Sequence, residues 1–173
     1  VRDVIVAQQF GAAADAFFVA FKIPNFFRRL FAEGAFSVAF VPVLSEYRTQ
    51  RTFDEVKLLV ARVSGVLGLA LLGITCLALI GADYLPWVFS PGFRSDPDKF
   101  ALTGDLLRIT FPYLFFISMT AFASSVLNAY GRFAVPAFTP VILNITLIAA
   151  TLFYTDYFEE PLYALAWGVF FAG

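Results

Sequence analysis

Apolar residues occupy most of this chain in long runs, which short clusters of charged and turn-forming residues separate. A bilayer core about 30 Å thick requires roughly 20 apolar residues in an α-helix. Runs of that kind predict membrane-spanning helices at 58–82, 106–131 and 133–155. Two more apolar runs meet the ends of the chain and predict truncated helices over 1–14 and 162–173. The chain is therefore expected to be a piece of a longer membrane protein.

The stretch 15–45 predicts a further membrane-spanning helix, but one with a polar face. It is rich in Phe, yet it carries charges that are costly in lipid and that usually face a protein interior or a water-filled cavity. Pro24 predicts a kink in it and Gly34 a looser segment. With this stretch, the pattern predicts the all-α class, as a polytopic transmembrane helix bundle. Its charged residues are Asp15, Lys22, Arg28, Arg29 and Glu33.

Composition narrows the class of protein. The 173 residues are 60% hydrophobic and 14% charged, whereas typical soluble domains are about 25% charged. This excludes a disordered chain, a nucleic-acid-binding protein and a small disulfide scaffold. One Cys and no His exclude the usual zinc sites, Cys–His nucleophiles and an intramolecular disulfide. We expect no metal, no cofactor and no nucleic-acid partner.

The charges between the predicted spans indicate an orientation. Basic residues gather in segment 45–62 and beside Gly131, whereas segments 83–105 and 155–161 are mainly acidic. The positive-inside rule counts Lys and Arg, so the first two segments are expected on the cytoplasmic side. The N-terminus of a full-length protein would then also be cytoplasmic.

At 100° per residue, several polar residues of 15–45 fall within an arc of about 80°. The arc holds Asp15, Lys22, Arg29, Glu33 and Ser37, with Asn25 at its edge. Arg28 lies about 100° away from Arg29. Two interpretations of this stripe remain open, a hydrated cavity and a structural seam of ion pairs between helices.

Arg2 and Arg28 are the candidates for a shared binding site. With a rise of 1.5 Å per residue, Arg2 lies roughly 14 Å below Gly11, and Arg28 roughly 20 Å below Asp15. Both are then near mid-membrane, where paired guanidinium groups attract a phosphate or pyrophosphate. In the seam interpretation, Asp3 instead neutralises Arg2. Asn128 and Asn144 are expected to be interhelical hydrogen-bond donors.

The segment Phe26-Phe-Arg-Arg-Leu-Phe-Ala-Glu-Gly34 and its flanks closely resemble the lipid II flippase family, MurJ. The resemblance covers essentially the whole chain. It implies the N-terminal lobe of a two-lobed transporter of the MOP superfamily, located in the bacterial cytoplasmic (inner) membrane. Such proteins are not enzymes; they move lipid II, a polyprenyl-pyrophosphate-linked peptidoglycan precursor, from the cytoplasmic to the periplasmic leaflet by alternating access. The implied partners are lipid II, membrane lipids and the C-terminal lobe of the same protein.

The resemblance also implies roles for individual residues. Arg2 and Arg28 match cavity arginines of the family, and we follow it in preferring Arg28 to Arg29, which stays the second choice. The expected substrate-binding set is Arg2, Arg28, Arg29 and Asn25. The expected gating and charge network is Asp3, Asp15, Lys22, Glu33 and Ser37.

Three alternatives compete with this interpretation. The first is another polyprenyl-linked oligosaccharide flippase or an exporter of the same superfamily. The second is a membrane-embedded transferase, which requires clustered acids for Mg²⁺ or a catalytic His. The third is a membrane scaffold, which would be indifferent to loss of the charges in 15–45.

Overall fold

The computed structural model describes residues 14–29, 35–89, 92, 96–153, 158 and 162–172, and these form helices and short connections without a strand. The predicted all-α class is therefore confirmed. The partial helix predicted over 1–14 lies outside the described residues, except for its last position. The described helices are α2 (Ala14–Arg28), α3 (Ala35–Gln50), α4 (Phe53–Ile80), α5 (Leu85–Phe89), α6 (Pro97–Thr110), α7 (Tyr113–Ala129), α8 (Ala134–Phe153) and α9 (Leu162–Ala172).

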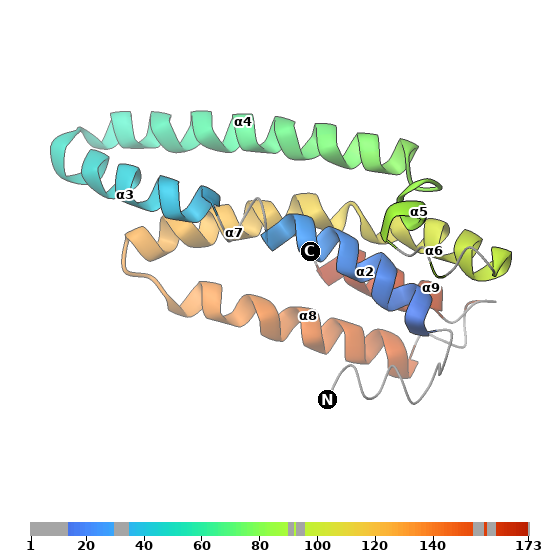
Figure 1. Ribbon diagram of the computed structural model, residues 1–173. Helices are drawn as coiled ribbons and strands as arrows, with labels where there is room; N and C mark the ends of the chain where they lie inside the picture. The colour runs from blue at the N-terminus through green and yellow to red at the C-terminus, as the bar shows by residue number, and fades with distance from the viewer. Residues whose placement is uncertain are drawn as a thin grey trace.

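The long helices run side by side along one common direction (Figure 1). α3 and α4 form a hairpin, with α4 along one edge of the bundle and α8 along the opposite edge. α2, α7 and α9 lie between these edges, and α6 continues the line of α7. The α3–α4 turn and the α7–α8 connection share one end, while the α4–α5 turn and the start of α6 share the other.

Three segments of the described chain are long and apolar enough to cross a membrane: Phe53–Ile80, Pro97–Ala129 and Pro136–Phe153. A membrane-spanning helix is expected to expose apolar side chains to lipid. α4 does so, because its outer face carries large apolar side chains that the bundle leaves exposed. Leu69 is 72% exposed and Leu77 is 71% exposed. Such a surface suits lipid rather than water. The helices are therefore those of a membrane protein.

The predicted helix over 15–45 is described as two helices. α2 ends at Arg28, Arg29 follows with π-helical geometry, and α3 begins only at Ala35. Gly34, where a looser segment was predicted, lies outside the described residues. Pro24 lies inside α2, where a kink was predicted.

The structure also differs from the predicted helix over 106–131. The helical segment begins earlier, at Pro97, and a turn at Phe111–Pro112 divides it into α6 and α7. The Asp96 carboxylate caps the new start by accepting a hydrogen bond from the Lys99 amide at 3.1 Å, and proline suits the first helical position. The division falls at Pro112, because proline has no amide hydrogen for the helical ladder.

α4 starts five residues before the predicted boundary, so much of the expected charged loop is helical. A capping box fixes this start. The Thr52 hydroxyl accepts from the Glu55 amide at 3.4 Å, and the Glu55 carboxylate accepts from the Thr52 amide at 3.0 Å. Two amide groups that a helix start leaves without partners are thereby satisfied.

Replacing this cap is expected to weaken the α3–α4 hairpin. Thr52→Ala removes the hydroxyl acceptor and should lower the free energy of unfolding by about 1 kcal/mol. Thermal unfolding of the complete protein in detergent measures the change. Thr52→Ser keeps the hydroxyl and should unfold at the parent temperature. Equal unfolding temperatures for Thr52→Ala and the parent would show that the cap contributes nothing.

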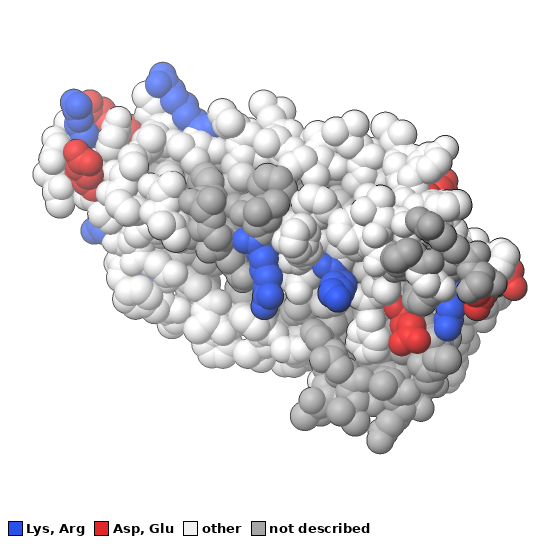
Figure 2. Space-filling model, in the orientation of Figure 1, with Lys and Arg blue, Asp and Glu red and all other residues white. Residues whose placement is uncertain are grey.

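The basic segments predicted to share one side of the membrane meet in the structure. The Arg48 guanidinium donates to the Ala129 carbonyl at the end of α7 and lies 4.1 Å from the centroid of the Tyr130 ring. This joins the α3–α4 hairpin to the α7–α8 connection, which carries Arg132. Figure 2 shows that charged side chains lie mainly at the two ends of the molecule and over α2.

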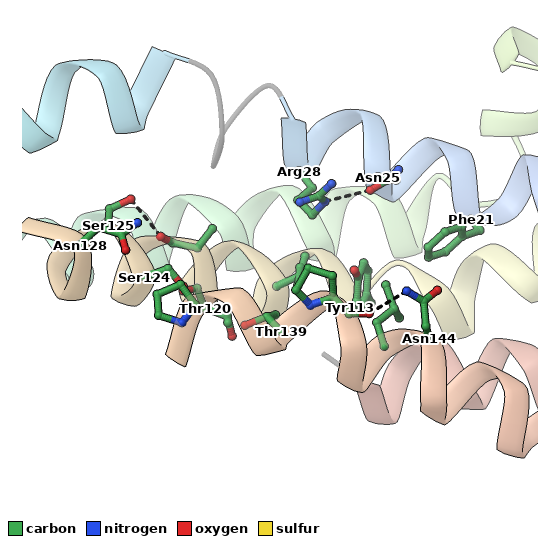
Figure 3. A pocket seen from close by; sticks show the side chains of 15 residues that line it. Phe21, Asn25, Arg28, Tyr113, Thr120, Ser124, Ser125, Asn128, Thr139 and Asn144 are labelled. Carbon is green, nitrogen blue, oxygen red and sulfur yellow. Dashed lines mark hydrogen bonds between the residues drawn. The ribbon is translucent and has the colours of Figure 1, made fainter. Parts of the chain in front are cut away.

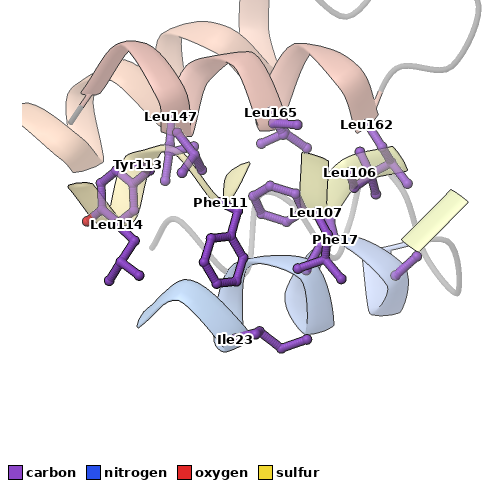
Figure 4. Close-up of a cluster of buried hydrophobic side chains, with 14 of the residues drawn as sticks. Phe17, Ile23, Leu106, Leu107, Phe111, Tyr113, Leu114, Leu147, Leu162 and Leu165 are labelled. Atoms are coloured by element: carbon purple, nitrogen blue, oxygen red, sulfur yellow. The ribbon is translucent and has the colours of Figure 1, made fainter. Parts of the chain in front are cut away.

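The main apolar core lies where α2, α6, α7 and α9 meet (Figure 4). Phe17 and Ile23 of α2 pack in the same cluster as Phe111, and Leu165 contributes from α9. Each of these side chains is at most 3% exposed. One face of α2 is thus fixed against α6, which determines where its polar faces point.

Candidate functional site

α2 has three faces with different surroundings. Its apolar face is buried in the core. Its second face carries Asp15, Lys22 and Arg29, which share a spacing of seven residues and are all exposed. The predicted polar stripe is therefore present in the described part of the helix. The third face carries Asn25 and Arg28, and it borders a cavity.

The cavity has a volume of about 510 Å³ and lies between α2, α7 and α8 (Figure 3). Polar groups from all three helices line it, although α7 and α8 belong to segments apolar enough to span a membrane. Its polar lining residues are Asn25, Arg28, Tyr113, Thr120, Ser124, Ser125, Asn128, Thr139 and Asn144.

Arg28 gives the cavity its charge. Its Nε donates to the Asn25 Oδ1 at 2.8 Å, so the guanidinium is tied to the helix turn before it. Arg28 is the only charged residue among the described residues that line the cavity. A guanidinium is always protonated and binds phosphate oxygens with two parallel donors. The cavity is therefore suited to an anion, a phosphate above all.

The walls formed by α7 and α8 are uncharged but rich in hydrogen-bonding groups. The Ser124 hydroxyl donates to the Thr120 carbonyl at 2.7 Å, and the Asn144 amide donates to the Pro140 carbonyl at 2.8 Å. These bonds stay within each helix, which lets polar side chains occupy an apolar segment. A hydroxyl that donates in this way keeps lone pairs with which to accept from a ligand.

The structure places Arg28 and Arg29 on different faces of the chain. Arg28 lines the cavity together with Asn25, as two members of the predicted binding set. Arg29 is exposed on the neighbouring face with Lys22 and is not among the lining residues. The choice between the two followed the resemblance rather than the helical wheel, and the wheel alone would have placed the emphasis on Arg29.

The other predicted residues are not brought into this cavity. Within the described residues, no ion pair links Asp15, Lys22 or Arg29 to one another, so the stripe forms no seam of its own there. The side chain of Ser37 in α3 lies outside the described part of the structure, and so do Arg2, Asp3 and Glu33.

Sequence reasoning missed the polar wall of the cavity. Thr120, Ser124 and Asn128 recur every four residues along α7, which places them on one face of a helix. This spacing is visible in the sequence, but the residues are uncharged, so the pattern of charges within the spans does not reveal it. The expectation for Asn144 was wrong, because its amide donates within its own helix.

Comparisons with known proteins agree on one family. The family model described as lipid II flippase MurJ matches residues 6–173. The lipid II flippase MurJ of Burkholderia cenocepacia is 47% identical over 174 residues, which cover 99% of this chain and 34% of that protein. The probable lipid II flippase MurJ of Haemophilus influenzae is 46% identical over 182 residues, which cover 100% and 36%.

A solved structure supports the same assignment. It is described as lipid II flippase MurJ in an inward closed conformation, and it matches with a TM-score of 0.76 at 33% identity. The match covers 99% of this chain and 36% of that chain. The chain thus spans about a third of the length of the curated relatives it matches. Because both sequence and fold match over nearly all of its residues, the chain belongs to the lipid II flippase MurJ family.

Proposed function

We propose that the complete protein carrying this chain flips lipid II from the cytoplasmic to the periplasmic leaflet by alternating access. The family supports this activity. The observation that carries it is the position of Arg28, held by Asn25 in a polar cavity between apolar helices. Charge at this depth is costly unless it serves a pathway or a partner. This chain supplies the N-terminal lobe, and the other lobe completes the transporter.

The cavity provides places for the chemically different parts of such a substrate. The pyrophosphate binds Arg28, with Arg2 as a second guanidinium and Arg29 as the reserve candidate. The hydrated sugar and peptide occupy the polar space beside α7 and α8, and the polyprenyl tail stays in lipid. Rocking of the two lobes changes the leaflet to which the cavity opens. No step in this cycle breaks a covalent bond.

The exposed charged face of α2 is proposed to face the rest of the protein or water. Asp15, Lys22 and Arg29 would be too costly against lipid tails. Such charges can pair with different partners in the inward-open and outward-open states of the transporter. They would then act as gates that hold one side of the cavity closed. Asp3, Glu33 and Ser37 complete this proposed network.

We propose the bacterial cytoplasmic membrane as the location, with the N-terminus in the cytoplasm. Support comes from the end of the bundle where the α3–α4 turn and the α7–α8 connection meet. This end carries Arg48, Arg51, Lys57 and Arg132, and basic residues mark the cytoplasmic side.

The test is replacement of the lipid II flippase in living cells. The complete gene product is expressed in bacteria depleted of their own flippase, beside an empty vector. Growth and the appearance of lipid II in the periplasmic leaflet should both be restored. An inserted, well-expressed protein that restores neither would contradict the proposal and favour another polyprenyl-linked oligosaccharide as substrate.

A further inference from the structure

Pro24 leaves one backbone carbonyl of α2 without its helical partner. In an α-helix the carbonyl of residue 20 accepts from the amide of residue 24, and proline has no amide hydrogen. Ala20 is fully buried, at 0% exposure. A buried carbonyl without a donor is costly, and most costly in a membrane, where water cannot replace the missing bond.

Thr110 supplies the missing donor from another helix. Its hydroxyl donates to the Ala20 carbonyl across 3.2 Å, and Thr110 is itself 0% exposed. Thr110 is the last residue of α6, directly before the turn at Phe111–Pro112. The bond therefore connects the proline position of α2 to the proline break between α6 and α7.

The acceptor of the Thr110 hydroxyl differs from those of three other helical threonines. Thr103, Thr146 and Thr151 each donate to the carbonyl four residues earlier in their own helix, over 2.7 to 2.9 Å. Such bonds are the usual way for a helical threonine to satisfy its hydroxyl. Thr110 donates to α2 instead, where a carbonyl needs a donor.

Ring contacts hold α2 on both sides of Pro24 to the same break. The Phe21 ring lies 6.0 Å from the Tyr113 ring, and the Phe27 ring lies 6.0 Å from the Phe111 ring, measured between centroids. The cavity-lining part of α2 thus packs against Phe111 and Tyr113 at the α6–α7 turn.

We infer that Thr110 is a positioning residue, which holds the Arg28-bearing half of α2 in place by bonding the carbonyl that Pro24 frees. Arg28 is four residues beyond Pro24 on the same helix, so the direction of this half determines where its guanidinium lies. The geometry stands without any ligand; only its consequence for transport rests on the proposed function.

The experiment compares Thr110→Val, Thr110→Ser, Pro24→Ala and the double variant Pro24→Ala with Thr110→Val, all in the complete protein in detergent. Valine keeps the shape and removes the donor, whereas serine keeps the donor. Pro24→Ala restores an amide to the Ala20 carbonyl. Thr110→Val should lower the unfolding temperature measurably in the parent but not in the Pro24→Ala background, and Thr110→Ser should not lower it.

A distance measurement reports the position of α2 directly. Nitroxide labels go on Phe26→Cys of α2 and Ile142→Cys of α8, which are 54% and 56% exposed, with Cys76 and any other native cysteine removed. Thr110→Val should shift or broaden the distance distribution, and Thr110→Ser should reproduce the parent. This comparison decides the matter even if Pro24→Ala does not fold.

The inference is overturned if Thr110→Val leaves both readouts unchanged, or if it lowers the unfolding temperature equally in both backgrounds. Neither readout uses lipid II. A shifted distance in Thr110→Val, in a protein whose parent fails to replace the cellular flippase, would keep the positioning role and reject the proposed function. Where the parent does replace it, Thr110→Val should reduce growth and Thr110→Ser should not.

Discussion

Arg28→Ala should abolish the growth that the complete protein is proposed to restore in cells depleted of their own flippase. The side chain is the only charged group among the described residues that line the cavity. A hydrogen bond to a charged group contributes about 1.5–3 kcal/mol, so losing even one such bond to a phosphate weakens binding by roughly 10-fold or more. The protein itself should insert and accumulate normally, because Arg28 is only half-buried and takes no part in the apolar core.

Two further variants separate geometry from charge. Arg28→Lys keeps the positive charge but loses the planar fork, so partial activity is expected. Arg132→Ala is the matched control, because Arg132 is exposed in the α7–α8 connection and is not among the residues that line the cavity. Growth is scored beside a measurement of protein in the membrane. Normal growth with Arg28→Ala would reject the cavity role of Arg28 but would leave the family assignment untouched.

The faces of α2 show what a helical wheel can predict and what it cannot. A wheel at 100° per residue correctly groups Asp15, Lys22 and Arg29, since one regular helix carries all three. It does not show which face meets α7 and α8, because that depends on how Phe17 and Ile23 pack in the core. The assignment of Arg28 to the cavity therefore came from the resemblance, whereas the polar wall formed by α7 and α8 came only from the structure.

In the α6–α7 segment, by contrast, the sequence contains a local helix-start signal, but the charged residues around it led to a different prediction. Asp96 followed by Pro97 is a good helix start, but the mainly acidic segment 83–105 was interpreted as a connection between spans. In the structure Arg108 pairs with Asp83 at 2.7 Å and with Asp105 at 3.0 Å. Charges that find partners at the end of a bundle are compatible with a helix there, and hydropathy does not detect such partners.

Gly168→Ala should destabilise the packing of α9 against α8, although alanine is by itself the better helix former. An ideal Cβ at position 168 would lie 2.8 Å from the Ala150 Cβ and 3.6 Å from a methyl of Leu147. The first distance is well inside van der Waals contact, so the helices would have to separate. Overpacking of this kind costs about 1–3 kcal/mol, which exceeds the helix-propensity gain of up to about 1 kcal/mol.

The consequence extends beyond the contact, because α9 also carries Leu165 into the core that holds α2. Thermal unfolding of the complete protein measures the effect, and Ala150→Gly provides a specific rescue. Combined with Gly168→Ala it removes the clashing methyl, so the double variant should unfold at a higher temperature than Gly168→Ala alone. Gly73→Ala in α4 is the matched control, because a Cβ there meets nothing within 4 Å, and it should leave stability unchanged or slightly raised. If Gly168→Ala and Gly73→Ala behave alike, α9 does not pack on α8 through this glycine, and the core beneath α2 must be held in another way.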